Sequence, residues 1–247
     1  MGRRSIGRGF RGGRPARKML LLAAVAAVLL FYLIWSGVSW LRSEMPYWGR
    51  QPSEIVTAAL DGIKTASSYT YTLETALTEG GQETRLAVFS GAKSGRDARV
   101  VGELTFLKTT VEVIRKEDKL YRKDYSDSRW VELPLLSLES LDKLMVEMEP
   151  LTIFSFADLA EAKYAGKEKA DGVKCRVYEI MTRGEHPWLI DYWEDFTYRL
   201  WVDQQTGQLV RGEIRADQPG NGARGIVVRL SLGDVGKEIT IEAPSEP

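Results

Sequence analysis

The longest apolar stretch of the chain is a run of 23 residues without a charged side chain, from Met19 to Leu41. At about 1.5 Å per residue, a helix of this length reaches roughly 34 Å, which is enough to cross a bilayer core of about 30 Å. Seven basic side chains and no acidic one precede the run, and such an excess marks the cytoplasmic side of a membrane helix. We therefore predict a basic cytoplasmic tail over residues 1–18, one transmembrane helix over 19–41, a linker over 42–52 and an extracytoplasmic domain over 53–247.

A cleaved signal peptide is the alternative interpretation of this run. The apolar part of a signal peptide normally spans about 7–15 residues and ends at a small-x-small cleavage site. Here the run is longer, the bulky Trp35 and Trp40 lie near its end, and Ser36–Ser39 offers only a weak site. The single cysteine, Cys175, excludes lipid attachment at an N-terminal cysteine. The sequence therefore favours an uncleaved signal anchor that holds the protein in the cell membrane.

The first part of the predicted domain has helical spacing. Ser53 has the side chain of a helix N-cap, and Glu54 suits the first turn. The apolar residues recur every three or four positions at Ile55, Val56, Ala59, Leu60 and Ile63. This pattern predicts an amphipathic helix of about 14 residues with one apolar face.

After Ser67 the hydrophobic period becomes two, which is typical of strands. Residues 69–77 alternate in this way, and Gly80-Gly81 predicts a hairpin turn. Further alternating segments, separated by short turns, continue to Leu133. Consecutive strands joined by short turns predict an antiparallel meander.

The middle of the chain returns to helical spacing, and we expect helices over 135–148 and 151–162. A second set of strands starts at Lys163, contains the hairpin signal Asp171-Gly172, and ends with a last strand over 239–241. The pattern predicts an α+β fold in which a curved antiparallel β-sheet of about ten strands, a half-barrel, wraps the central helices.

Three stretches have a common character, namely a strand or hairpin that carries aromatic residues. They are Leu120–Lys123 with Trp130, Ala170–Tyr178, and Leu200–Asp203 with Thr206-Gly207 and Leu209–Arg211. Over residues 53–243, these stretches and the order of elements resemble the bacterial LolA/LppX-like lipoprotein-carrier fold and the related RseB-like sensor domains. The resemblance implies a half-open barrel around helices, with an apolar cavity for acyl chains. Because this chain keeps a membrane span and lacks a lipid-attachment cysteine, it fits a tethered binder or sensor better than a free carrier.

Charge and composition exclude several classes of protein. Of the 34 basic residues, seven lie in the N-terminal tail, which leaves 27 against 34 acidic residues and a net charge of −7 in the rest. This balance argues against a nucleic-acid-binding protein. One cysteine and one histidine exclude an internal disulfide, a haem-attachment motif and a metal site built from several such ligands.

Candidate catalytic residues are few, and no recognised catalytic motif occurs. We interpret His186 as a surface loop residue and Cys175 as a small buried hydrophobe. Asp191 with Glu194-Asp195 is interpreted as solvated charge. We therefore predict a protein that is not an enzyme and that has neither a cofactor nor a metal site.

The candidate ligand-binding residues are those on the alternating apolar faces of the first meander. They are Tyr69, Tyr71, Leu73, Leu86, Val88, Leu104, Phe106, Val111 and Val113. Packing against the central helices is the alternative role for each of them, because hydrophobic periodicity does not tell the two faces of a sheet apart.

The segment Gly184–Asp195 is the most unusual in the chain, since five large apolar residues stand between two strands. They are Trp188, Leu189, Ile190, Tyr192 and Trp193. We expect a lid over an apolar cavity or a docking patch. The alternative is a helical turn buried on the sheet.

These features predict a membrane-tethered, extracytoplasmic domain that binds a lipid acyl chain or a lipoprotein and catalyses no reaction. The alternative hypothesis is a protein-interaction or stress-sensing module of the cell envelope, with a filled core and no ligand. The expected partners are therefore the membrane, a lipid or lipoprotein, or an envelope protein, and no nucleic acid.

Overall fold

The structure is a computed structural model of the chain. It describes residues 28–35, 38, 47, 49–105, 108–117, 119–126, 129–133, 149–156 and 158–244, except the side chains of Trp188 and Asn221. The chain divides into two compact units, Met1–Trp48 and Gly49–Pro247. No helix of the described residues combines the length and the hydropathy that a bilayer span requires. The predicted tail and most of the predicted transmembrane helix and linker lie outside the described residues.

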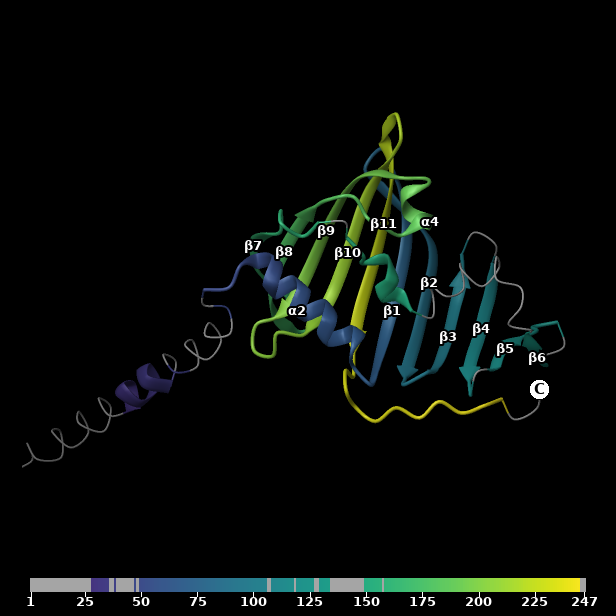
Figure 1. Cartoon of the computed structure of the whole chain (residues 1–247), viewed down its shortest axis with the longest axis horizontal. Coiled ribbons are helices and arrows are strands. Elements are labelled where there is room, and N and C mark those ends of the chain that lie inside the picture. The colour runs from purple at the N-terminus through teal and green to yellow at the C-terminus, as the bar shows by residue number, and fades with distance from the viewer. Residues whose placement is uncertain are drawn as a thin grey trace, which may run out of the picture. The chain divides into compact units, whose positions relative to one another are not determined.

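Within the described part of the second unit, eleven strands form one open antiparallel sheet (Figure 1). The order across the sheet is β6-β5-β4-β3-β2-β1-β11-β10-β9-β8-β7. The strands are β1 Ser68–Glu79, β2 Gln82–Ser94, β3 Asp97–Leu104, β4 Thr109–Lys116, β5 Lys119–Lys123, β6 Trp130–Leu133, β7 Lys163–Ala170, β8 Val173–Met181, β9 Glu194–Asp203, β10 Leu209–Gln218 and β11 Asn221–Gly233. The predicted antiparallel α+β architecture is confirmed, and the open, curved sheet fits a half-barrel.

The two meanders meet in the middle of the sheet. β1 pairs with β11 from Thr70 opposite Gly233 to Glu79 opposite Arg224, so the first strand of one meander joins the last strand of the other. This long-range pairing is what makes one sheet out of two local ones.

The predicted hairpin turns form where the sequence placed them. Asp171 and Gly172 have φ values of 49° and 84°, and Gly80 and Gly81 have φ values of 56° and 81°. A two-residue type I′ turn needs positive φ at both central positions, which Gly and Asp tolerate better than most residues. The turn chemistry therefore sets the register of both hairpins.

Helix α2, Pro52–Lys64, starts slightly earlier than predicted. Gln51, rather than Ser53, is the N-cap, and its backbone N–H donates to Glu54 Oε2 at 3.2 Å. Pro52 takes a position in the first turn, where its fixed φ suits a helix and its missing N–H costs no hydrogen bond. The buried residues of α2 are the five predicted ones, Ile55, Val56, Ala59, Leu60 and Ile63.

One face of the sheet carries the helices, and we call it the inner face. Figure 1 shows α2, the short 3₁₀ helix η2 (Pro150–Ile153) and α4 (Pro187–Ile190) on the same side, with α2 crossing β8 to β10. Phe154, directly after η2, lies where a Cβ on Gly212 would be, so Gly212 faces inward. Directly opposed residues share a face, and the inner row through Gly212 therefore includes Leu230, Leu73, Phe89, Gly102 and Val111.

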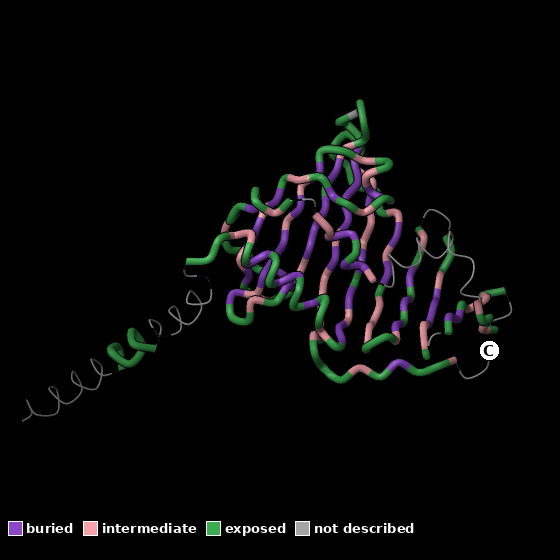
Figure 2. The backbone as a smooth tube through the Cα atoms, viewed as in Figure 1, coloured by how far each residue is buried: buried purple, intermediate pink, exposed green. Residues whose placement is uncertain are grey.

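The core is densest on the inner face of the central and second-meander strands. Figure 2 shows buried positions alternating along these strands. Tyr198 on β9 has no exposed surface, and its ring is surrounded by Phe156 at 4.7 Å, Phe196 at 6.1 Å and Phe154 at 6.5 Å between ring centroids. Aromatic contacts of this kind contribute beyond simple burial.

The predicted helix over 151–162 is wrong. Among the described residues of this stretch, the structure has only the 3₁₀ turn η2, and Phe156 then forms a β-bridge with Gly184. Phe154 and Phe156 both pack on Tyr198, and two residues at i and i+2 reach one ring from an extended chain but not from a helix. The helix predicted over 135–148 lies outside the described residues.

The predicted last strand over 239–241 is also wrong, because this segment pairs with no strand among the described residues. Ile239 and Ile241 instead pack against Ile114 and Tyr121 on the outer face of the first meander. In Figure 1 the segment is the yellow chain that runs from the end of β11 toward β5. It covers apolar side chains that the outer face would otherwise expose.

Candidate functional site

The strand register divides the predicted ligand-binding residues between the two faces. On the inner face lie Tyr69, Tyr71, Leu73, Leu104, Val111 and Val113. Val88 pairs with Glu74 and Glu103 and therefore faces outward, while Leu86 stands at a bulge between Arg85 and Ala87. Phe106 lies outside the described residues.

The inner face of the first meander is closely packed. The ring of Tyr71 occupies the space above Gly91, and the ring of Phe89 occupies the space above Gly102. Tyr69, Tyr71 and Leu73 are at most 3% exposed. Burial, with the negative charge of Glu149 as a smaller cause, raises the pKa of Tyr69 to about 12. These side chains are buried neutral groups, and their part in binding a ligand stays a prediction.

A small ionic cluster stands at the edge of this packed region. Arg115 and Lys93 approach Glu149 at 3.1 Å and 3.8 Å, and the Lys93 ammonium lies 5.9 Å from the centre of the Tyr69 ring. All three charged side chains are partly shielded from water, and because two cations share one carboxylate the cluster keeps one net positive charge.

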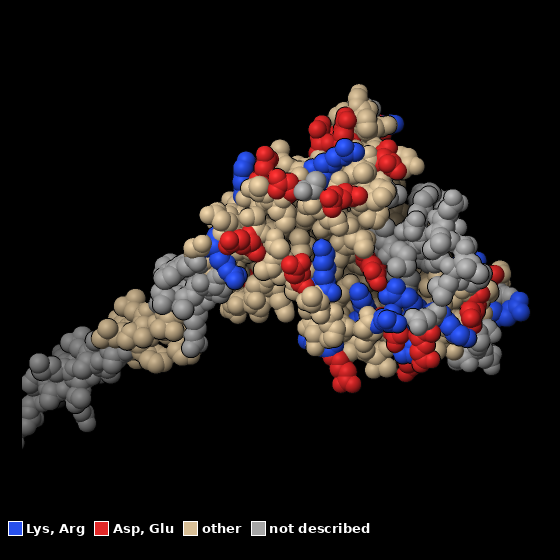
Figure 3. All heavy atoms as spheres, viewed as in Figure 1, with Lys and Arg blue, Asp and Glu red and all other residues tan. Residues whose placement is uncertain are grey.

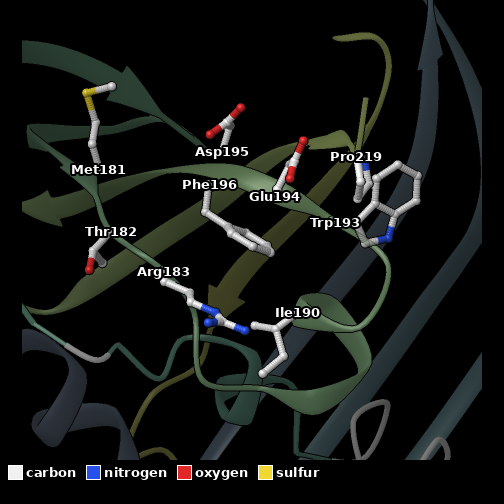
Figure 4. A pocket seen from close by; sticks show the side chains of 9 residues that line it. All are labelled: Met181, Thr182, Arg183, Ile190, Trp193, Glu194, Asp195, Phe196 and Pro219. Carbon is white, nitrogen blue, oxygen red and sulfur yellow. The ribbon is translucent and has the colours of Figure 1, made fainter. Parts of the chain in front are cut away.

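An open cleft of about 710 Å³ lies at the far end of the second meander. Its lining comes from the end of β8, the segment after it, the start of β9 and the β10–β11 turn. The lining residues, shown in Figure 4, are Met181, Thr182, Arg183, Ile190, Trp193, Glu194, Asp195, Phe196 and Pro219. Five of these nine side chains are apolar, so the cleft offers an apolar surface with a polar margin.

A break in strand pairing makes room for this cleft. Asp195 has a φ of 53°, and β9 carries one extra residue between the pairs Thr197–Arg215 and Glu194–Asp217. A bulge of this kind bends the strand and redirects its side chains. The segment before it leaves the sheet as α4, and Leu189 holds that helix in place because it is completely buried.

The other end of the segment is tied to the chain that follows η2. The backbone N–H of Glu185 donates to the carbonyl of Ser155 at 3.1 Å, next to the bridge between Gly184 and Phe156. The wall that contains Arg183 is therefore fixed at both ends, by this bridge and by Leu189.

The structure distributes the predicted lid residues between buried and exposed positions. Leu189 is in the core, Ile190 and Trp193 line the cleft, and Tyr192 is 63% exposed. The side chain of Trp188 is outside the described part of the structure. The segment is thus a helical turn that also forms one wall of a cleft, while its role as a lid stays a prediction.

The sequence did not single out five lining residues, which are Met181, Thr182, Arg183, Phe196 and Pro219. They flank the unusual segment or lie in a turn far away in sequence, and the cleft exists only because β9 lies between β8 and β10. One signal was available in the sequence, because Met181 is a large apolar residue at the end of a predicted strand. In the structure its side chain is 63% exposed.

The charged lining residues lie on two sides of an aromatic ring. Figure 4 shows Phe196 between the Arg183 guanidinium, which lies near Ile190, and the carboxylates of Glu194 and Asp195. Glu194 Oε1 accepts a hydrogen bond from the backbone N–H of Gly220 at 3.2 Å. Apart from these charged groups, the only other polar side chain of the lining is the hydroxyl of Thr182.

The lone cysteine lies away from this cleft. Cys175 is fully buried on the outer face with Val177 and Trp201, and burial raises the pKa of its thiol to about 11. A buried thiol with this pKa stays protonated at neutral pH and reacts slowly. Its interpretation as a small buried hydrophobe agrees with the structure.

Comparisons with known proteins bear on the fold. No protein-family model matches the sequence, and no curated protein matches it either. Among solved structures, LprF from Mycobacterium bovis matches with a TM-score of 0.52 and 13% identity, covering 78% of this chain and 96% of that one. The lipoprotein LppX from Mycobacterium tuberculosis matches with a TM-score of 0.51 and 16% identity, covering 77% and 98%.

A LolA superfamily protein from Nitrosomonas europaea also matches, with a TM-score of 0.33, 12% identity and coverage of 78% of this chain and 96% of that one. Identities of 12–16% indicate a shared fold rather than a shared function. The matches to the two mycobacterial proteins cover almost the whole length of those proteins. The protein therefore has a LolA/LppX-like fold, as its sequence motifs predict.

Proposed function

We propose that this protein binds the acyl chain of a lipid or lipoprotein outside the cytoplasm and catalyses no reaction. The observation that carries the proposal is the open cleft of about 710 Å³ between β8, α4, β9 and the β10–β11 turn. Sites for small ligands are commonly clefts of about 300–1,000 Å³ with mostly apolar walls and a few polar groups. Met181, Ile190, Trp193, Phe196 and Pro219 supply such walls.

The chemistry of the lining supports binding without catalysis. Enzymatic acyl or phosphoryl transfer needs a nucleophile beside a base, or a bound metal. The cleft has one guanidinium and two carboxylates on opposite sides of Phe196. The LolA/LppX-like fold supports the same assignment, because the resemblance implies a cavity for acyl chains.

The location follows from the sequence rather than from the described residues. The apolar run 19–41 and the basic residues before it favour a membrane anchor with the N-terminus in the cytoplasm. Residues 53–247 then lie on the outer side of the membrane, in the cell envelope, where lipids and lipoproteins are available.

A fluorescent fatty acid titrated into the full chain tests the proposed function. Ile190→Glu places a charge on the apolar wall, so we expect about a ten-fold or greater loss of affinity, because an unpaired charge is costly in an apolar site. Val131→Glu is the matched control, since Val131 is 43% exposed on β6 and does not line the cleft. Equal affinity of the wild type and both variants, or no binding by any of them, would contradict the proposal.

The packed inner face favours a second candidate, a protein-interaction or stress-sensing module with a filled core. Tyr71, Leu73 and Val113 are nearly or completely buried, so this part of the fold resembles an ordinary core. This candidate predicts that the fatty acid does not bind and that an envelope protein does.

A further inference from the structure

Two unusually exposed apolar side chains belong to the cleft lining or directly precede a lining residue in the chain. Among the described residues from Gly49 onward, Met181 and Tyr192 are the most exposed large hydrophobic ones, each at 63%. The next most exposed are Tyr125, Tyr164 and Val131, at 43–45%, on the turn after β5 and on the two edge strands. Single exposed hydrophobic residues are common on proteins, but two at one cleft form a local feature.

Both residues are linked to the cleft by their place in the chain. Met181 is itself a lining residue, and Tyr192 directly precedes the lining residue Trp193. Tyr and Trp rings carry an apolar body and a polar tip, which suits the boundary between lipid headgroups and acyl chains. The mouth thus combines the residue types that favour a bilayer surface.

The charge around the mouth does not favour an anionic surface. The cleft contributes Arg183 against Glu194 and Asp195. Figure 3 shows acidic and basic side chains interspersed over the visible face of the described unit, rather than a field of one sign. Attraction to anionic lipid needs a cluster of Lys or Arg, so any contact of this mouth with a membrane rests on its apolar side chains.

We propose that the mouth of the cleft docks on the surface of a bilayer of neutral phospholipid, with Met181 and Tyr192 inserted at the headgroup boundary. This proposal rests on the proposed function, because docking there lets an acyl chain enter the cleft without crossing water. A protein partner needs about 800 Å² of matching surface on each side, whereas the exposed apolar surface here is two side chains beside an opening. The lipid surface therefore fits better than a protein.

Site-specific labels on the full chain test the docking. Tyr192→Cys and, as a control, Tyr125→Cys each receive an environment-sensitive fluorophore, since Cys175 is buried and its thiol pKa is about 11. Each labelled protein is mixed with phosphatidylcholine vesicles that contain lipids bearing a quencher. We expect a blue shift and several-fold stronger quenching at position 192 than at position 125. We also expect little change between about 0.1 and 1 M salt, which shortens the Debye length from about 10 to 3 Å.

Equal quenching at both positions would overturn the docking proposal, as would quenching at position 192 that needs anionic lipid or disappears in high salt. Binding of a soluble fluorescent fatty acid to the wild type, without vesicles, is measured in parallel. If the fatty acid binds and the label at position 192 meets no lipid, docking fails and the proposed function stands. If the fatty acid does not bind, the proposed function itself fails.

Discussion

At the scale of single residues, glycines on the inner face let aromatic rings lie on the sheet. Tyr71 lies over Gly91, Phe89 over Gly102, and Phe154 over Gly212. A Cβ at any of these glycines would overlap the ring, and none of the three has the positive φ that requires glycine for backbone reasons. Their role is therefore steric, and it couples neighbouring strands through large apolar contacts.

Gly102→Ala is expected to lower the free energy of unfolding by about 1–3 kcal/mol, because the added methyl group displaces Phe89 from a packed core. Gly62→Ala is the control: it lies in α2 with nothing within 4 Å of its added Cβ, so it should stabilise the protein by about 0.5–1 kcal/mol. Urea unfolding of the full chain measures both. An unchanged midpoint for Gly102→Ala would show that the ring moves aside without cost.

Among the described residues, the hydroxyl of Tyr198 has no hydrogen-bond partner, although Tyr198 is completely buried. Burial also raises the pKa of this hydroxyl far above its ordinary value, so it stays neutral. An unsatisfied buried polar group costs about 1–3 kcal/mol. Tyr198→Phe should therefore increase the free energy of unfolding by about 1 kcal/mol, which raises the midpoint of urea unfolding. A lower midpoint would mean that the hydroxyl has a partner, for instance a buried water.

At the scale of elements, opposite charges alternate across five strands of the outer face. Glu179, Arg199, Glu213, Arg229 and Glu74 stand directly opposite one another on β8, β9, β10, β11 and β1. Arg229 Nε donates to Glu213 at 2.9 Å. Cross-strand pairs of opposite charge favour this register over a slipped one, and they keep the exposed face of the sheet soluble.

Glu83 extends this network and makes it sensitive to pH. Arg229 donates two hydrogen bonds of 2.8 Å to its carboxylate and lowers its pKa. A lowered pKa in the folded state stabilises the fold above the pKa of the unfolded chain, and this contribution is lost as pH falls through the folded-state value. Glu83→Gln should therefore lower the melting temperature at pH 7, and the difference from the wild type should shrink below the folded-state pKa.

Melting curves at pH 7 and in acid measure this effect, and Glu242→Gln is the control, because Glu242 is exposed and forms no ion pair with the residues that the structure describes. A difference between Glu83→Gln and the wild type that is the same at both pH values would contradict a role for this carboxylate in the pH dependence.

Hydrophobic spacing and turn residues predicted those elements whose formation depends on neighbouring residues in the chain. The apolar stripe of α2 and the Asp171-Gly172 turn depend on neighbouring residues, and both are confirmed. The segment after Pro150 failed because Phe154 and Phe156 reach across the sheet to Tyr198. Such a long-range contact overrides helix propensity. The hydrophobic spacing within one segment carries no information about it.

At the scale of the whole molecule, the architecture has a clear signal in the sequence, whereas the cleft has none. The order of helix and meanders is enough to indicate a curved antiparallel sheet, and the LppX-like fold agrees with it. The cleft depends on a bulge at Asp195 and on a distant turn at Pro219. Neither has a periodic signal, so the predicted binding residues concentrated on β1 to β4 instead.

The bulge on β2 explains why Leu86 and Val88 do not share one face with the other candidate residues. Strict alternation put Leu86 and Val88 on one face with the other candidates, but β2 has an irregularity opposite Thr75-Ala76. Phe89 therefore faces inward and Val88 outward. A one-residue shift moves every later side chain to the other face, and the sequence carries little sign of it.

The most direct test of the central claim is to map where an acyl chain binds on the full chain. A fatty acid with a photoactivatable group is bound, cross-linked by light, and located by mass spectrometry of peptides. Acyl binding in the cleft predicts cross-links within residues 181–196 and near Pro219, which unlabelled fatty acid removes and Ile190→Glu weakens. Cross-links confined to residues 69–73 and 111–113 of the inner face, or to the apolar run 19–41, would contradict it.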